Sequence, residues 1–308
     1  MITDTHKTDS ATRNIHNFSR LKRKKLKKQA GWPVYVVLIF YAAIIIAPFL
    51  IVVSTSLKTW SEASGTEFHL IPQKGWDVSG YVEVFTYRAN YEATLPTLIR
   101  SFLNTLMYII PPTVLGLFAS ALSGYAFAKL RFPAKNVIYT LLLATMMMPG
   151  IICLAPTFSI YDMIGWVDTP FPLMIPGMFG AAACVFFMRQ FYMGVPDSLV
   201  EAAKIDGAGY MKIFFTVMVP LSVPALMAQG VLGFVGGYND YFNPLIYLQS
   251  SDLYNLQVAL RTFASVYEAQ KPNVVMAGTL VALVPTLIIY FLAQNYFVEG
   301  IVTSGIKQ

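Results

Sequence analysis

The sequence predicts an all-α, polytopic membrane protein with six transmembrane helices. Only 12% of its 308 residues are charged and 56% are hydrophobic, whereas soluble domains carry about 25% charged residues. Six stretches contain no charged residue, and each can hold the ~20 apolar residues of a spanning helix. These stretches are 29–57, 101–128, 136–161, 169–188, 213–239 and 272–298. The strands of a β-barrel would be polar at every second position, which these stretches are not.

The basic residues predict the orientation of the spans. With the N-terminus inside, the cytoplasmic segments carry 16 of the 22 Lys and Arg residues. These segments are 1–28, 129–135, 189–212 and 299–308. Cytoplasmic loops of membrane proteins carry such an excess. We therefore predict a multi-pass protein of the cell membrane with both termini in the cytoplasm.

Residues 1–30 are predicted to form a basic cytoplasmic tail before the first span, at about 33–54. The run Lys-Arg-Lys-Lys at 22–25 is close to that span. This position fits a topology determinant or a contact with anionic membrane lipid, and it argues against nucleic-acid binding. The span is too long for the hydrophobic region of a signal peptide, so we interpret it as an uncleaved anchor.

The segment 31–98 is predicted to combine the first span with an external loop at 55–98. Six aromatic residues stand among polar residues there, namely Trp60, Trp76, Tyr81, Phe85, Tyr87 and Tyr91. This pattern predicts a folded interfacial loop with short amphipathic helices. Aromatic residues at this depth are typical of membrane-interface belts, and docking of an external protein is the alternative for any of them.

Residues 99–295 are predicted to form a core of five helices. The spans lie at about 100–127, 136–158, 170–191, 213–238 and 274–294. Prolines predict distortions in three of them, since transporters tolerate kinks when neighbouring helices satisfy the freed carbonyls. The sites are Pro111-Pro112 (a kink), Pro149-Gly150 (a bend at mid-membrane), and Pro220 with Pro224 (breaks in the fifth span). The small residues Ser120, Ser123 and Gly124 predict close helix packing.

A short polar segment at 195–212 lies between the fourth and fifth spans. Ser198 and Glu201 have the spacing of a capping box. Asp206-Gly207 fits a helix end, because Gly adopts a positive φ readily. These signals predict a helix at 198–206, which is too short to be stable alone in water.

One face of this predicted helix suits contact with another protein. Leu199, Ala202 and Ala203 share a face by their i, i+3, i+4 spacing. The two alanines make that face low enough for close approach, and one oxygen of Glu201 remains for a cation on a partner. The alternative is a well-capped turn that only returns the chain to the membrane.

The same segment resembles the signature loop of the permease subunits of ABC importers. That signature consists of Glu-Ala-Ala, a Gly after three residues, and a later Leu-Pro turn. This chain has Glu201-Ala202-Ala203, Gly207 and Pro220, with Val219 in place of the usual Leu. In that family the loop is a cytoplasmic coupling helix that docks into a separate ATPase. The resemblance therefore implies ATPase coupling by Glu201, Ala202, Ala203, Asp206 and Gly207.

Three further stretches resemble the same family. Residues 125–133 look like its first cytoplasmic turn, and 238–245 resemble a Trp-Asn-Asp motif of sugar-importer permeases, with Tyr238 in place of Trp. The tail at 296–308 is similar to the end of the second permease subunit of the maltose-type transporters. In that group the tail reaches between the ATPase subunits, which implies such contacts for Thr303, Ser304 and Gly305.

The polar residues at the outer ends of two spans are candidates for the translocation pathway. Tyr238, Asn239 and Asp240 offer an aromatic ring, an amide and a carboxylate, which suit the ring faces and hydroxyls of a sugar. Asn104 is polar near the outer end of the second span. The same groups would equally cap a helix and anchor a loop at the membrane interface.

The resemblance implies a binding-protein-dependent importer of the carbohydrate class, maltose or multiple-sugar, in the bacterial cytoplasmic membrane. It implies a type I importer fold of six transmembrane helices with a cytoplasmic coupling helix. The chain would form half of the pathway for a sugar or oligosaccharide. Implied partners are a second, homologous permease subunit, two ATPase subunits, an extracytoplasmic sugar-binding protein and membrane lipid.

The sequence argues against a catalytic role for the chain itself. It lacks the GxxxxGK[ST] pattern of a P-loop, so ATP and Mg are expected on the partner ATPase subunits. Its histidines His6, His16 and His69 are scattered and indicate no metal site. Cys153 and Cys184 fall within spans and are expected to be buried apolar residues.

Two other functions stay open from the residues alone. An ion-coupled transporter or channel usually carries ionisable groups inside its spans, but the charge-free stretches have none, and Asp240 at a span edge is the best candidate. A membrane assembly factor without transport activity would leave the loop at 195–212 unexplained.

Overall fold

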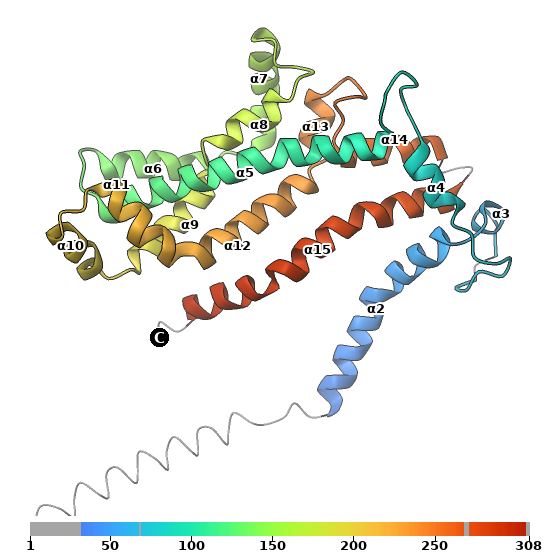
Figure 1. The fold of residues 1–308 in the computed structure, drawn as a ribbon, viewed down its shortest axis with the longest axis horizontal. Coiled ribbons are helices and arrows are strands. Elements are labelled where there is room, and N and C mark those ends of the chain that lie inside the picture. The colour runs from blue at the N-terminus through green and yellow to red at the C-terminus, as the bar shows by residue number, and fades with distance from the viewer. Residues whose placement is uncertain (1–31, 68, 268–270, 306–308) are drawn as a thin grey trace, which may run out of the picture. The chain divides into compact units, whose positions relative to one another are not determined.

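The computed structural model describes residues 32–67, 69–267 and 271–305, which are helical apart from short connections and contain no strand (Figure 1). The predicted basic tail at 1–30 therefore lies outside the described residues. The elements are α2 (Trp32–Ser56), α3 (Trp60–Ala63), α4 (Ser79–Thr86), α5 (Thr97–Lys129), α6 (Lys135–Thr145), α7 (Gly150–Met163), α8 (Phe171–Met178), α9 (Ala182–Met193), α10 (Asp197–Ile205), α11 (Tyr210–Ile213), the π-helix η1 (Phe214–Met218), α12 (Val219–Tyr238), α13 (Phe242–Tyr247), α14 (Leu256–Tyr267) and α15 (Pro272–Gly305).

The predicted spans agree with the helices of the structure. Among the described residues, five helical segments are long and apolar enough to cross a membrane, and a sixth is obtained when α6 and α7 count as one bent span. The five are Trp32–Ser56, Thr97–Lys129, Phe171–Met193, Tyr210–Tyr238 and Pro272–Leu292. The first is the most apolar, with a mean hydropathy of 3.1.

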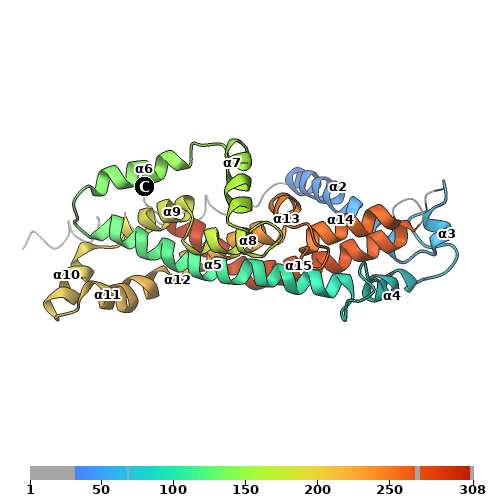
Figure 2. The ribbon, with the colours of Figure 1, turned by 90° about the horizontal axis from the view of Figure 1, so that it is seen from above.

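The chain divides into two compact units, 1–52 and 53–308. In the second unit, α5 is the central helix, and α8, α9 and α12 pack along it (Figures 1 and 2). Helix α15 packs along α12, and α4 and α14 contact both α5 and α15.

Small residues allow these helices to approach closely. A Cβ at Gly116 of α5 would lie 2.2 Å from the carbonyl oxygen of Gly177, and a Cβ at Gly124 would lie 2.8 Å from the Cβ of Met188. Both distances are shorter than any van der Waals contact, so only Gly fits at either position. Ser120, between them, is fully buried. The close packing predicted from Ser120 and Gly124 is therefore confirmed.

The third and fourth spans are interrupted. Helices α6 and α7 meet at an angle of 95°, a much sharper break than the bend predicted at Pro149-Gly150. Helices α8 and α9 are separated at Gly180, whose φ of +93° favours glycine. In both cases the chain leaves the helix near Pro or Gly residues, which weaken helix continuation.

The predicted breaks at the prolines of the fifth span are wrong. The helix runs from α11 through η1 into α12 without interruption, and Pro220 occupies the first turn of α12. A proline ring clashes with the carbonyl four residues before it in a regular α-helix. The wider turn of the π-helix η1 precedes Pro220 and relieves this clash. Helix α5 also continues through Pro111 and Pro112.

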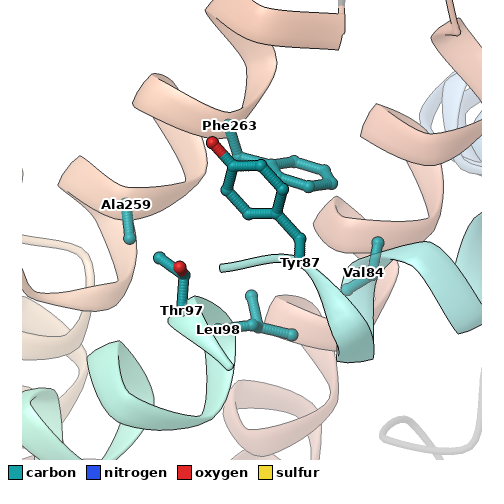
Figure 3. Close-up of a pocket in the computed structure, with 6 residues that line it drawn as sticks. All are labelled: Val84, Tyr87, Thr97, Leu98, Ala259 and Phe263. Atoms are coloured by element: carbon teal, nitrogen blue, oxygen red, sulfur yellow. The ribbon is translucent and has the colours of Figure 1, made fainter. Parts of the chain in front are cut away.

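The segment 55–98 contains short helices as predicted, namely α3 and α4. The ring of Tyr87 meets that of Phe263 edge-on, with centroids 5.2 Å apart. Figure 3 shows this contact beside a cavity of about 10 Å³, which is no larger than a water molecule needs. The connection between the fifth and sixth spans contains the helix α14. Leu98 of α5 and Val274 of α15 pack in the same cluster as Phe263, so these contacts join α5, α14 and α15.

Candidate functional site

Helix α10 forms the predicted short helix of the loop at 195–212. It spans Asp197–Ile205 and ends at Asp206, followed by Gly207 with a φ of +77°. The predicted helix end is therefore confirmed. The predicted capping box is wrong, because the N-cap position falls on Pro196 and no side chain caps the helix. Ser198 lies inside the first turn, where its hydroxyl cannot act as an N-cap.

The residues that α10 exposes are not all those of the predicted face. Val200 is buried and Ala203 is half-buried, and both pack against the helices beneath. Leu199, Ala202 and Ile205, spaced by three residues, are exposed instead. The prediction placed Ala203 with Leu199 and Ala202, so it was right for two residues and wrong for one.

The exposed side of α10 carries large apolar groups. Ile205 is 86% exposed and Leu199 is 44% exposed. Glu201, Asp206 and Gly207 are also exposed. Exposed apolar groups with a charged surround mark contact sites on proteins. The predicted coupling residues are therefore accessible on this helix, except for the half-buried Ala203.

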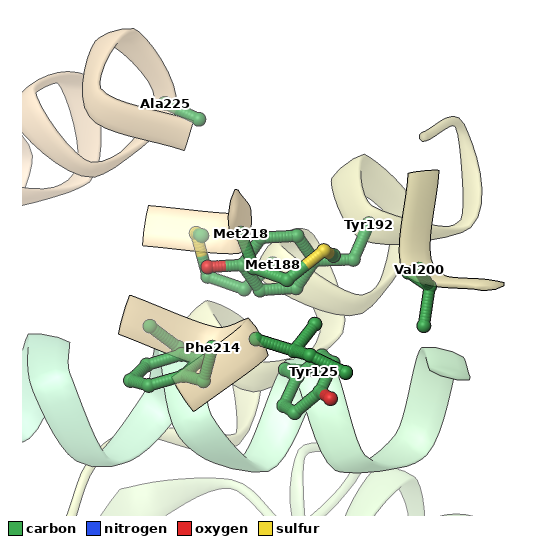
Figure 4. Packing of buried hydrophobic residues seen from close by; sticks show 9 residues of the cluster. Tyr125, Met188, Tyr192, Val200, Phe214, Met218 and Ala225 are labelled. Carbon is green, nitrogen blue, oxygen red and sulfur yellow. The ribbon is translucent and has the colours of Figure 1, made fainter. Parts of the chain in front are cut away.

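A buried hydrophobic cluster packs against α10 through Val200 (Figure 4). It joins Tyr125 of α5, Met188 and Tyr192 of α9, and Phe214 and Met218 of η1. The first two rings, Tyr125 and Tyr192, meet edge-on. In total the cluster consists of Ala121, Tyr125, Met188, Tyr192, Val200, Ile213, Phe214, Met218 and Ala225. Because Val200 belongs to it, α10 is packed on three spans at once.

Lys129 connects the end of α5 directly to the start of α10. Its Nζ donates a hydrogen bond to the Val195 carbonyl at 2.6 Å and forms an ion pair with Asp197 Oδ1 at 2.5 Å. The Lys129 side chain is only 5% exposed. Its hydrogen bond and charge hold the pKa of the Asp197 carboxyl below its usual range. Lys129 belongs to the turn at 125–133, but its contacts with Val195 and Asp197 could not be predicted from the sequence.

A cavity opens between the spans, away from α10. It has a volume of about 340 Å³ and is lined by residues of α5, α8, α9 and α12 together with Ala181. Most of its lining is apolar or small, and Thr113, Ser120 and Gln229 are its principal polar side chains. A second cavity of about 70 Å³ shares Tyr108, Ile109, Leu173 and Gly237 with the first and extends to Asp240.

Of the predicted pathway residues, only Asp240 lines either cavity. Its carboxylate accepts hydrogen bonds from the backbone N–H and the side-chain amide of Asn243. Asn239 Nδ2 donates to the Val235 carbonyl one turn earlier. Both residues therefore serve the helix end, as the alternative interpretation expected.

Tyr238 and Asn104 hold elements together. Tyr238 is buried, and its hydroxyl donates to the Ala282 carbonyl of α15 at 2.7 Å. Asn104 Nδ2 donates to the carbonyls of Asp252 and Tyr254. These contacts join α12 to α15 and α5 to the loop before α14.

The predicted tail continues helix α15. The backbone of Thr303, Ser304 and Gly305 is helical, at the end of α15. The side chains at these positions lie outside the described residues. Helix α15 thus extends past the predicted end of the sixth span at 294.

No group of His, Cys, Asp and Glu side chains in the described ranges is arranged to hold a metal ion. The two cysteines are unpaired, and Cys184 lines the larger cavity. Both are partly rather than fully buried.

Comparisons with known proteins agree with this architecture. The arabinooligosaccharide transport permease protein AraQ of Halalkalibacterium halodurans is 29% identical over 286 residues, covering 92% of this chain and 99% of that protein. The lactose transport permease protein LacG of Rhizobium radiobacter and the sn-glycerol-3-phosphate transport permease protein UgpE of Yersinia pestis are each 34% identical over 203 residues, 66% of this chain. These matches cover 74% of LacG and 72% of UgpE.

A solved structure has the same fold over most of the chain. It is a bacterial ABC transporter that imports the acidic polysaccharide alginate, with 25% sequence identity and a TM-score of 0.76. The match covers 87% of this chain and 96% of that one. The family model for binding-protein-dependent transport system inner membrane components matches residues 113–302, which include α10 and most of the residues that line the larger cavity. The chain therefore belongs to this family, and it is a multi-pass transport permease of the cell membrane rather than an enzyme.

Proposed function

We propose that this chain is the permease subunit of an ABC importer for a neutral sugar or oligosaccharide. It forms half of the translocation pathway and couples alternating access to ATP hydrolysis by separate subunits. The exposed apolar side of α10, seated on a buried cluster shared by three spans, carries this proposal. A second protein that binds this surface can transmit its movement through α10 to the membrane helices.

In this proposal Leu199, Glu201, Ala202, Asp206 and Gly207 contact an ATPase subunit. Leu199 and Ala202 form an apolar surface that a partner can approach closely, and the Glu201 carboxylate can bind a cation on the partner. Ala203 acts from the inner side, since it packs on the cluster. The end of α15, with Thr303, Ser304 and Gly305, is a second proposed contact.

The packing beneath α10 suits the transmission of motion. Protein interiors are as dense as organic crystals and deform little. A displacement of α10 therefore moves Val200 against Tyr125, Tyr192 and Phe214, which stand on α5, α9 and η1. The larger cavity lies between α5, α8, α9 and α12, so the same displacement changes its shape.

The lining of the cavities favours a neutral substrate. The larger cavity includes no charged side chain, and the smaller one includes the carboxylate of Asp240. A phosphate would be repelled by that carboxylate, whereas sugar hydroxyls can bond to Thr113 and Gln229. Two of the relatives are named for arabinooligosaccharides and lactose, and one for sn-glycerol-3-phosphate. We therefore favour the sugars.

The proposed assembly contains a second, homologous permease subunit, two ATPase subunits that bind ATP and Mg, and an extracytoplasmic sugar-binding protein. Both termini and α10 face the cytoplasm, in agreement with the distribution of basic residues. Docking of ATPase subunits requires this orientation, because ATP is cytoplasmic.

Co-purification and ATP hydrolysis test the proposal. We expect ATPase subunits to co-purify with the wild type, and Ile205→Asp or Glu201→Lys to remove them or abolish stimulation by a sugar-loaded binding protein. Ile71→Asp is the matched control, because Ile71 is also exposed but lies in the segment 55–98. If no ATPase accompanies the wild-type chain, the proposal fails. Ion coupling at Asp240 would then be tested by transport driven by an ion gradient.

A further inference from the structure

A cluster of three cations lies where α5, α6 and α9 come together. Arg131 follows α5, Lys135 begins α6, and Arg189 lies in the last turns of α9. The positive charges of Arg189 and Arg131 act on Lys135, whose Nζ donates a hydrogen bond to the Leu130 carbonyl at 2.9 Å. Like charges at this spacing repel each other. The repulsion among these three cations favours the binding of an anion beside them.

Two buried donors in this cluster have no hydrogen-bond partner. The guanidinium of Arg189 lies over the ring of Tyr139, with its Cζ 4.1 Å from the ring centroid. Arg189 Nε and the Tyr139 hydroxyl are buried without a partner among the described residues. An unpaired buried donor costs about 1–3 kcal/mol.

The start of α6 adds a third positive feature. Its N-cap residue, Ala134, has a φ of +57° and supplies no side-chain cap. The N-terminus of a helix carries a partial positive charge and free N–H groups. Lys135 stands in this first turn, where a cation is unfavourable and an anion is favoured. The three cations and the N-terminus of α6 thus both favour a negatively charged ligand.

The next turns of α6 are apolar and exposed. Val137 is 61% exposed and Leu141 is 63% exposed. These side chains face outward directly after the cations, so the surface changes from strongly basic to apolar within two turns. A phospholipid has the same sequence of groups, a phosphate followed by acyl chains.

We propose that Arg131, Lys135 and Arg189 bind the phosphate of an anionic phospholipid in the membrane leaflet at the inner ends of α5 and α9. The phosphate accepts hydrogen bonds from the guanidinium groups and neutralises the cluster. The acyl chains lie along Val137 and Leu141. The bound lipid thereby fixes the turn between α5 and α6 against α9, beside the cluster that supports α10.

Lipid retention tests this site. The protein is purified from its membrane with the subunits that accompany it and placed in nanodiscs containing phosphatidylglycerol and phosphatidylcholine. Native mass spectrometry then counts the phosphatidylglycerol that remains bound after release. Each cation near a membrane surface contributes about a fivefold increase in affinity for anionic lipid. We expect Arg189→Gln to weaken retention about fivefold and Arg131→Gln/Arg189→Gln about 25-fold.

Lys212→Gln is the matched control. Lys212 is exposed on α11, and its replacement by Gln also removes one positive charge. We expect it to retain phosphatidylglycerol like the wild type. A second arm adds inorganic phosphate, with chloride at equal ionic strength as its reference, and lipid should stay bound in both. Equal retention by the double variant overturns the proposal. Two other results would show that a lipid is not the occupant of this site. In one, inorganic phosphate displaces the bound phosphatidylglycerol and chloride does not. In the other, the double variant loses an associated subunit and keeps its lipid.

Discussion

At the scale of single residues, Lys129 is the contact on which the position of α10 depends most directly. Its ammonium group joins the end of α5 to the Val195 carbonyl and to Asp197, at the start of α10. We expect Lys129→Met to lower the stability of the purified protein by about 2 kcal/mol, because a charged hydrogen bond contributes about 1.5–3 kcal/mol. It should also reduce stimulation of ATP hydrolysis. Thermal unfolding and ATPase assays measure the two effects.

Asp197→Asn is the comparison for that change. It removes the ion pair with the exposed carboxylate, which contributes little because water and salt screen it, but leaves the bond from Lys129 to Val195. We therefore expect a much smaller loss than for Lys129→Met. Equal losses in the two variants would contradict the assignment of the Val195 bond as the stronger contact.

Tyr267 of α14 leads us to predict that the stability of the protein depends on pH in the alkaline range. Burial, followed by the neighbouring negative charge of Glu83, raises the pKa of Tyr267 to about 12. A raised pKa means that the neutral phenol stabilises the fold below the ordinary pKa of 10.0 and that this contribution disappears as the pH rises to about 12. Alkaline unfolding should therefore begin at a higher pH in Tyr267→Phe. An unchanged midpoint would show that Tyr267 does not control this transition.

At the scale of elements, the two alanines of the signature are predicted to act differently. Ala203 packs on the buried cluster, whereas Ala202 is exposed. Ala203→Leu overfills that contact and should cost about 1–3 kcal/mol of stability. Ala202→Leu should leave stability unchanged and weaken only the association with ATPase subunits. Unfolding and co-purification of the two variants separate these effects, and a stability loss in Ala202→Leu would refute the orientation of α10.

The orientation of α10 also shows where sequence reasoning reached its limit. Its length and the glycine at its end were predictable, because Gly207 is a local signal. The buried face was not, because Val200 packs in a cluster with Tyr125, which belongs to α5 and is distant in the sequence. The capping box failed for a related reason. The helix begins one residue earlier than its spacing suggested, and Asp197 is engaged by Lys129.

At the scale of the whole molecule, the spans could be predicted from charge-free stretches, because the bilayer imposes length and polarity on every spanning helix. The right-angle break at 146–149 could not, since Pro149-Gly150 permits a range of angles and packing of α6 on α9 selects one. The pathway residues were the weakest prediction. Asn104 and Tyr238 looked like ligands for a sugar, but their partners are carbonyls of neighbouring segments.

Membrane topology gives a prediction for the whole chain. The test uses a variant with Cys153 and Cys184 replaced by Ser. A membrane-impermeant thiol reagent should label Ile71→Cys in cells whose cytoplasmic membrane is intact and whose outer layers have been removed. It should label Ile205→Cys only after the membrane is opened, because α10 is cytoplasmic in the proposed orientation. Both positions are well exposed in this chain. The reverse pattern would invert the orientation.

The π-helix η1 also determines the angular phase between the two ends of its span. Successive residues of an α-helix are about 100° apart around its axis, so one extra residue in a turn offsets everything after it by that angle. Residues of α11 stand on one side of η1 and the cavity residue Gln229 on the other. Deleting Thr216 from η1 would therefore turn α11 and the loop before it relative to the cavity, although no contact residue changed. The spacing between loop and cavity is thus a matter of residue count as well as residue type.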